Sequence, residues 1–325
     1  MMQYTVLGRT GVTVSRLCFG TMSFGAEADE EMSIKMFQRC REAGINFFDC
    51  ADVYSDGRAE EILGRCVDTC RDELVLISKV CGPMGDDPNA RGLSRRHITA
   101  AVEASLKRLK TDRLDIYFAH KFDGATDLEH TLRAFDDLVR DGKILYPAVS
   151  NWAAWQIATA LGISKSEKLA RFECMQPMYN LAKRQAETEL LPLAEAENIG
   201  VIPYSPMGGG LLSGKYGVDY KPDSGRLLDR DMYAKRYSLD QYFETAQRFT
   251  AHASERGVAP ASLAVAWVMA HPAVTAPIIG ARNLEQLEAS LASVEIDMTP
   301  EWRAEIAALS PAPPSATDRL EETIG

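Results

Sequence analysis

The amino-acid sequence predicts a (β/α)8 barrel, the TIM-barrel architecture, on three observations. Short runs rich in β-branched and aromatic residues alternate with longer stretches of helical periodicity, which is typical of repeated βα units. The first seven runs start roughly 30 residues apart, the size of one such unit. The chain of 325 residues has room for the roughly 250 residues of such a barrel and for an insertion before its last strand.

The first element expected is a β-hairpin. Residues 4–6 and 12–15 have strand character, and the Gly8-Arg9-Thr10-Gly11 segment between them is rich in turn residues. We expect this hairpin to cover one end of the barrel as a lid.

Strands and helices then alternate along the chain. The eight strands are expected over residues 15–20, 46–50, 74–80, 114–120, 144–150, 172–177, 201–205 and 276–280. Amphipathic helices are expected between them, over residues 30–43, 58–70, 94–109, 128–141, 152–162 and 184–198. Ser94 precedes its helix as an N-cap residue should, while Gly44 and Gly142 follow theirs, where a left-handed cap is favoured.

A long surface loop is expected after the seventh strand. Residues 208–239 are rich in Gly, Asp, Lys, Arg and Tyr and show no clear period, and loops of that length usually have a function. No Pro/Ser-rich linker, change in composition or long repeat interrupts the βα rhythm, so the sequence predicts one domain over residues 1–325.

The composition excludes several classes of protein. With 46% hydrophobic and 25% charged residues the chain is neither disordered nor fibrous, and its net charge of −10 provides no overall positive field for nucleic acid. The longest apolar run, 263–270, is far shorter than the ~20 residues that cross a bilayer. Because the amino terminus also lacks a basic region followed by an apolar run, we expect no export and no membrane insertion.

The seven cysteines also favour a protein that is not exported. They are odd in number and scattered, without a Cys-x-x-Cys pair, which fits reduced thiols better than a disulfide framework or a zinc site. We therefore expect a cytoplasmic protein.

Familiar nucleotide-binding motifs are absent or incomplete. No G-x-G-x-x-G follows an early strand. Residues 209–216 approach a phosphate-binding loop, but Tyr216 replaces the Ser/Thr that would bind magnesium. Tyr179 and Lys183 have the spacing found in short-chain dehydrogenases, but the Gly-rich turn of those enzymes is missing, so we interpret the spacing as coincidence.

Four polar side chains lie at or just after the carboxyl ends of the second, third and fourth strands: Asp49, Tyr54, Lys79 and His120. In a parallel barrel these ends converge on one face, where the active site is built. A nearby ammonium lowers the pKa of a phenol, ordinarily ~10, and a carboxylate holds the ammonium in place. Tyr54 is then a candidate proton donor, and His120 a donor that polarises a carbonyl oxygen.

A purely structural alternative exists for each of these residues, namely a buried Asp–Lys ion pair and a hydrogen-bonded histidine at a strand end. For any one residue alone that alternative is favoured. Four such residues on one rim favour the catalytic interpretation.

Residues 44–55, followed by 59–64, resemble the first signature of the aldo-keto reductases, and the resemblance spans nearly the whole chain. It implies a nicotinamide cofactor, no metal, Tyr54 as general acid tuned by Lys79 and Asp49, and His120 positioning the substrate carbonyl. The short segments 20–22, 150–152 and 204–207, together with Gln176, also fall where this family contacts its cofactor. The structural alternatives here are that Gln176 satisfies barrel backbone and that Tyr204 belongs to the core.

The family binds its dinucleotide without a G-x-G-x-x-G turn. The resemblance therefore implies that the long loop over residues 208–239 binds part of the cofactor. Lys215 and Arg226 are implied as pyrophosphate partners, although both are also compatible with solvated loop charges. Residues 278–290 resemble the adenosine-phosphate segment, but one common form of it has Lys, Ser, Arg and Asn where this chain has Gly280, Ala281, Gln286 and Ser290. Arg282 can compensate as a forked donor to the 2′-phosphate, so we expect a preference for NADPH.

Carried over residue by residue, the implied cofactor contacts are Gly20, Thr21, Met22, Asp49, Ser150, Asn151, Gln176, Tyr204, Ser205, Pro206, Met207, Gly208, Gly210, Lys215, Arg226, Gly280, Arg282, Gln286 and Ser290.

The resemblance implies an NADPH-dependent oxidoreductase that reduces an aldehyde or ketone, including sugars and other carbonyl metabolites, to the alcohol. The alternative is a nicotinamide-binding, redox-sensing regulatory subunit with slow turnover, because the family includes potassium-channel β subunits. A barrel isomerase or lyase without nicotinamide is a third possibility. Expected walls of the substrate pocket are Phe24, Tyr54, Val80, Met84, Phe122 and Trp152. The sequence does not distinguish among carbonyl substrates, directions of hydride transfer or oligomeric states.

Overall fold

A computed structural model describes residues 1–317 and 319 of the chain, so the end of the domain expected over 1–325 lies outside the described residues. Eight parallel strands form one sheet in the order β10-β3-β4-β5-β6-β7-β8-β9. Their bounds are Cys18–Gly20 (β3), Phe47–Asp49 (β4), Val75–Val80 (β5), Leu114–Ala119 (β6), Ile144–Ser150 (β7), Cys174–Gln176 (β8), Gly200–Val201 (β9) and Ile278–Ile279 (β10). The Ile278 N–H donates to the Pro203 carbonyl at 2.9 Å, which joins the two ends of the sheet and gives the barrel predicted from the sequence.

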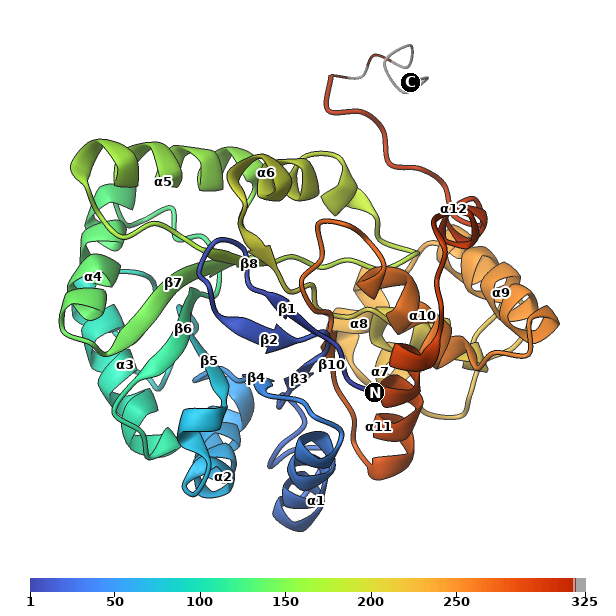
Figure 1. Cartoon of the computed structure of the whole chain (residues 1–325), viewed down its shortest axis with the longest axis horizontal. Coiled ribbons are helices and arrows are strands. Elements are labelled where there is room, and N and C mark those ends of the chain that lie inside the picture. Colours follow the sequence, from blue (N-terminus) through green and yellow to red (C-terminus); the bar gives the residue numbers. More distant parts are fainter. Residues whose placement is uncertain (318, 320–325) are drawn as a thin grey trace.

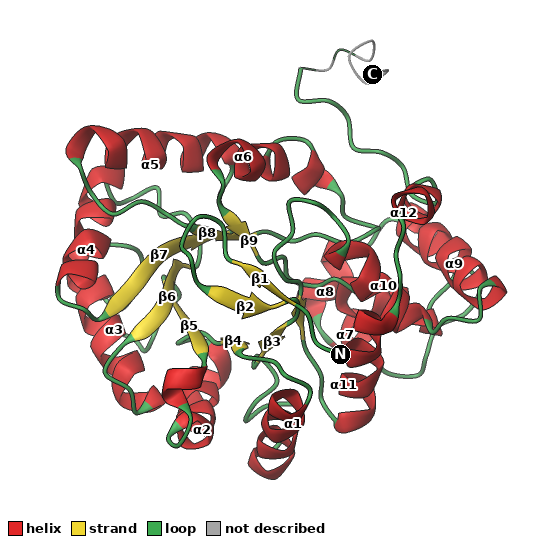
Figure 2. Cartoon of the chain, viewed as in Figure 1, coloured by secondary structure: helices red, strands yellow, loops and turns green. Residues whose placement is uncertain are grey.

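Helices surround this sheet, with α1 to α6 following the strands in chain order and α7 to α12 gathered on the remaining side (Figures 1 and 2). Their bounds are Glu30–Glu42 (α1), Arg58–Val67 (α2), Arg95–Leu109 (α3), Leu128–Arg140 (α4), Ala154–Glu167 (α5), Leu190–Glu197 (α6), Arg226–Asp229 (α7), Asp231–Arg236 (α8), Asp240–Glu255 (α9), Pro260–Met269 (α10), Leu284–Leu291 (α11) and Pro300–Ala307 (α12). Among the described residues, none of these helices combines the length and apolar character needed to span a bilayer.

The amino-terminal hairpin is confirmed as strands β1 (Tyr4–Val6) and β2 (Thr13–Ser15), paired antiparallel. It packs on the amino ends of the barrel strands, where Leu7 and Val14 join the inner core. A Cβ at Gly8 would lie 2.7 Å from the Gly200 backbone nitrogen, and Gly8 also has φ of +50°, so the close approach requires glycine. Because the hairpin closes this end, the carboxyl ends of the strands are left for a site.

Some predicted boundaries are wrong. Ser15 belongs to the hairpin rather than to the first barrel strand. The helix expected over 184–198 divides into a single turn at Gln185–Glu187 and α6, because Pro192 is tolerated only in the first turn of a helix. The helix expected to end at residue 162 continues to Glu167 and closes on the left-handed Lys168.

The loop expected over 208–239 contains short helices. Turns at Gly208–Gly210 and Leu211–Lys215 precede α7 and α8. These helices bury single side chains, Leu227 on α7 and Tyr233 on α8. One or two turns are too short to produce a readable helical period, so the sequence pattern missed them.

Candidate active site

Strand alternation aims a ring of polar side chains into the carboxyl end of the barrel. Successive side chains of a strand point to opposite faces, and the inner core contains Phe47, Ile77 and Phe118. The residues two positions further along these strands therefore also point inward. The same reasoning applies on the other strands, so the inward set at this end is Asp49, Lys79, His120, Ser150, Gln176 and Tyr204.

Lys79 is the centre of this ring. Its side chain is fully buried, and its ammonium donates to the Asp49 carboxylate at 2.7 Å, to the Cys50 carbonyl at 2.8 Å and to the Tyr54 hydroxyl at 3.2 Å. These three contacts use all three N–H donors of the ammonium. The structure thus brings together the carboxylate, the ammonium and the phenol that the sequence placed on three different segments.

The charges of this cluster set the protonation of Tyr54. Burial alone would lower the pKa of Lys79, but the neighbouring Asp49 carboxylate and Tyr54 outweigh it and raise that pKa, so Lys79 stays cationic. For Tyr54 we expected a lowered pKa, and this is wrong. Burial raises the pKa of the phenol by more than Lys79 lowers it, so Tyr54 carries its proton at neutral pH, the state a proton donor needs.

His120 faces Tyr54 across the mouth of the barrel. Their ring centroids lie 6.1 Å apart with the planes at 81°. Burial, with smaller contributions from the cations Lys79 and Lys121, lowers the pKa of His120 to about 3. The imidazole is therefore neutral at physiological pH and has one N–H to donate.

A tight turn presents Tyr54 to this cluster. Ser55, Asp56 and Gly57 all have positive φ, between 50° and 88°, a conformation that persists only where its surroundings hold it. Asp52 accepts a hydrogen bond from the Val53 N–H at 2.7 Å, at the start of the turn. Sequence reasoning missed Asp52, although an aspartate before a turn is a known signal of such side-chain capping.

A second group of polar side chains adjoins the first. The Gln176 amide donates to Asp49 at 2.8 Å, so its side chain contacts the buried carboxylate rather than barrel backbone. Tyr204 donates to the Asn151 side-chain oxygen at 2.8 Å, and the Asn151 amide donates to the Ser150 hydroxyl and the His120 carbonyl, both at 3.0 Å. Ser150, Asn151, Gln176 and Tyr204 thus form one hydrogen-bonded surface beside the tetrad.

Three of the remaining predicted cofactor residues make hydrogen bonds within the chain. Thr21 is buried and donates to the Asp49 carbonyl at 3.0 Å, and Ser290 is buried and donates to the Gln286 carbonyl at 3.3 Å. The Gln286 side chain accepts from the Arg282 backbone N–H at 3.2 Å. The two hydroxyls and the Gln286 amide oxygen therefore bind backbone groups in the structure.

The predicted phosphate partners are more open. Lys215 is exposed and the Arg282 side chain is half-buried, and neither makes an ion pair with the described residues. The Arg226 Nε is buried without a hydrogen-bond acceptor in the described part of the chain, 4.0 Å from Glu27. Gly208, Gly209 and Gly210 all have positive φ, between 61° and 104°, which turns the backbone as only glycine readily does.

The expected pocket walls need correction. Phe24, Val80 and Trp152 are buried in the outer core between sheet and helices, at 0, 0 and 4% exposure, so their side chains do not line an open site. Tyr54, Met84 and Phe122 remain half-buried on the rim. Trp155 was not among the rim residues expected from the sequence. It is 65% exposed, and its ring centroid lies 6.2 Å from that of Phe122. Its place in the first turn of the helix after the fifth barrel strand could have indicated this position.

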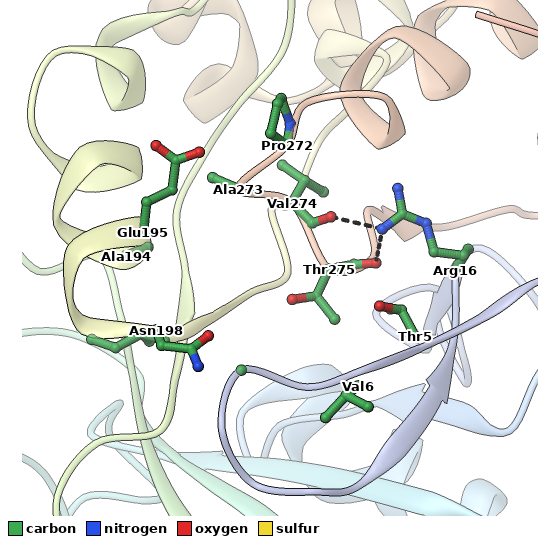
Figure 3. Close-up of a pocket in the computed structure, with 12 residues that line it drawn as sticks. Thr5, Val6, Arg16, Ala194, Glu195, Asn198, Pro272, Ala273, Val274 and Thr275 are labelled. Atoms are coloured by element: carbon green, nitrogen blue, oxygen red, sulfur yellow. Dashed lines mark hydrogen bonds between the residues drawn. The ribbon is translucent and has the colours of Figure 1, made fainter.

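A pocket of about 310 Å³ lies at the opposite end of the barrel (Figure 3). The hairpin residues Thr5 and Val6 line it together with segments that precede β9 and β10. Arg16 crosses it, but its guanidinium is occupied by the Met269, Val274 and Thr275 carbonyls at 2.5 to 3.0 Å. None of the residues that line this pocket belongs to the tetrad.

Comparisons with known proteins agree with the geometry. The sequence profile of the Aldo/keto reductase family matches residues 16–311. An uncharacterized oxidoreductase, YrpG, of Bacillus subtilis is 37% identical over 97% of this chain and 98% of its own length. A probable voltage-gated potassium channel subunit beta of Arabidopsis thaliana is 37% identical over 91% and 92%, and a versiconal hemiacetal acetate reductase of Aspergillus parasiticus is 30% identical over 92% and 94%. The chain therefore belongs to the aldo/keto reductase family.

Proposed function

We propose that this protein is an NADPH-dependent carbonyl reductase in which Tyr54 protonates the oxygen of an aldehyde or ketone. The observation that carries the proposal is the contact of the Tyr54 hydroxyl with the buried Lys79–Asp49 pair, opposite the ring of His120. Family membership and relatives named as an oxidoreductase and a reductase support the reaction class.

The residues of the rim fit a nicotinamide dinucleotide. Ser150, Asn151 and Gln176 offer amide and hydroxyl groups to the carboxamide, and Tyr204 offers a ring on which the nicotinamide stacks. The unpaired Lys215 and the unsatisfied, buried Arg226 Nε fit the pyrophosphate beside the turn of Gly208–Gly210. When bound, this cofactor supplies the hydride.

The preference for NADPH over NADH rests on Arg282. Its guanidinium has no carboxylate partner in the described chain and offers the forked donor geometry that suits a phosphate. The adjacent Gln286 holds its backbone through the Arg282 N–H. Gln286 and Ser290 then shape this segment, and Arg282 supplies the charge for the 2′-phosphate.

The side chains divide the chemistry among them. His120, neutral and able to donate, orients the substrate carbonyl oxygen toward the Tyr54 hydroxyl. Tyr54 gives its proton to that oxygen, and the phenolate left behind is stabilised by the adjacent Lys79 ammonium. Asp49, itself held by Gln176, keeps Lys79 in place.

An assay of NADPH consumption against a panel of aldehydes, ketones and reducing sugars tests the proposal. Wild-type protein should turn over at least one class of carbonyl, and Tyr54→Phe should lose that activity while binding NADPH as before. Turnover that is unchanged in Tyr54→Phe would rule out the proposed proton donor.

A second candidate function follows from the relatives named as potassium channel β subunits, which match more than nine-tenths of this chain. In this alternative the barrel senses the redox state of a bound nicotinamide and regulates a partner protein. Tight retention of the nucleotide, very slow turnover of every carbonyl and co-purification with a partner would favour it over the reductase.

A further inference from the structure

Arg236, the last residue of α8, places a cation beside the proposed nicotinamide platform. Its guanidinium carbon lies 6.0 Å from the centroid of the Tyr204 ring and 5.1 Å from that of the Tyr233 ring. A guanidinium this close to aromatic rings is attracted to their faces, which restricts its orientation. The side chain is half-buried.

Two neighbouring arginines lie near a carboxylate, whereas Arg236 does not. Arg226 and Arg230 both approach the Glu27 carboxylate, at 4.0 and 3.2 Å. Arg236 makes neither an ion pair nor a hydrogen bond with any residue that the structure describes. Arg236 is therefore a half-buried cation whose guanidinium is not occupied by the described chain.

A short series of contacts leads from Arg236 to the reacting groups. The Tyr204 ring that it approaches donates through its hydroxyl to Asn151, and Asn151 donates to the His120 carbonyl. His120 in turn faces Tyr54. Arg226 has no such contact with Tyr204: its guanidinium carbon lies 5.9 Å from the centroid of the Tyr233 ring, and its Nε lies 4.0 Å from Glu27. Of these two arginines, Arg236 is therefore the one linked to the tetrad side of the rim.

We propose that Arg236 binds an anionic oxygen group, a carboxylate or a phosphate, of the carbonyl substrate. This inference rests on the proposed reductase function and names a substrate class for it. The planar guanidinium forms paired hydrogen bonds with such groups, and contacts of this kind are among the stronger ones in proteins. The cofactor pyrophosphate has the same oxygen chemistry, so the test must separate the two sources of the anion.

The test compares Arg236→Gln with Lys235→Gln, a control that removes the same charge from the exposed preceding residue. The two substrates are para-carboxybenzaldehyde, which is anionic, and para-nitrobenzaldehyde, which is neutral. We expect Arg236→Gln to lower kcat/KM for the anionic aldehyde by about tenfold or more, mainly through KM. Turnover of the neutral aldehyde and the Kd for NADPH should change by less than about twofold, and Lys235→Gln should behave as wild type.

Three results would overturn the proposal. Equal losses for both aldehydes with weaker NADPH binding would assign the anion to the cofactor. Unchanged kcat/KM for both aldehydes would show that Arg236 does not bind the carboxylate of the substrate. A matching loss in Lys235→Gln would indicate a general effect of charge. Failure of the wild-type protein to reduce even the neutral aldehyde would instead count against the reductase function itself.

Discussion

The Lys79 ammonium nitrogen lies 3.2 Å from the Tyr54 hydroxyl oxygen and 4.8 Å from the centroid of the same ring. A fully buried cation is thus held against the phenol, with its charge balanced by Asp49 at 2.7 Å. Proton loss from Tyr54 therefore produces an anion already in contact with a cation, in a site where low dielectric strengthens their attraction.

Replacing Tyr54 with Phe tests the donor directly. Removal of the hydroxyl should lower kcat for carbonyl reduction by about two to four orders of magnitude, the usual contribution of a general acid. The ring remains, so the NADPH Kd and the thermal unfolding temperature should stay close to wild type. A kcat within a few fold of wild type would exclude Tyr54 as the donor.

Replacing Lys79 with Met should damage both stability and turnover. The variant leaves the Asp49 carboxylate buried without its cation, which typically costs about 3 to 5 kcal/mol of unfolding free energy. The double variant Lys79→Met with Asp49→Asn should regain much of that stability, as urea denaturation would measure, but not the turnover. A double variant that recovers activity along with stability would contradict the role of Lys79 in tuning Tyr54.

The pH–rate profile tests the neutral state of His120. Because its pKa is lowered to about 3, kcat/KM should show no limb near the ordinary imidazole pKa of about 6.5. The same lowered pKa makes the free energy of unfolding depend on pH. The stability associated with neutral His120 is present above about pH 6.5 and is lost as pH falls toward 3. An acidic limb near 6.5 that disappears in His120→Gln would show that the imidazole titrates and is cationic in the resting site.

Asp52 should make stability depend on pH. Its side chain is fully buried, one carboxylate oxygen has no hydrogen-bond partner in the described chain, and burial, followed by the charge of Glu60, raises its pKa to about 7. Because the folded state disfavours the carboxylate, the contribution of Asp52 to wild-type stability should fall as pH rises from about 4 to about 7. Asp52→Asn keeps the oxygen that accepts from Val53 and removes the charge.

Urea denaturation at acidic and at mildly basic pH would measure this effect. The stability of Asp52→Asn relative to wild type should increase with pH and exceed it by about 2 to 4 kcal/mol above neutrality. Asp56→Asn, an exposed position on the same turn, serves as the control and should show little change. A constant difference between Asp52→Asn and wild type across pH would contradict the buried titration.

The sequence predicts the arrangement of the tetrad because strand alternation and barrel symmetry act on short segments. Lys79 and His120 stand at strand ends whose register follows from their own apolar neighbours, so their convergence requires no knowledge of distant contacts. The hairpin is predictable for the same reason, since its turn residues are local.

Properties that depend on the depth of burial were not predictable. The sign of the Tyr54 pKa shift is a balance between burial and the Lys79 charge, and residue types alone do not give that balance. Phe24 and Trp152 lie near the site in sequence but are buried in the outer core. The position of Arg236 depends on short helices that have no sequence period.

A fluorescence titration of wild-type protein with NADPH, and separately with NADH, tests the central claim most directly. Bound reduced nicotinamide should change its own emission and quench nearby tryptophans such as Trp152. We expect saturable NADPH binding that is at least about tenfold tighter than NADH binding, as a guanidinium–phosphate contact would give. Absence of binding by either nucleotide would contradict both the reductase and the redox-sensor proposals.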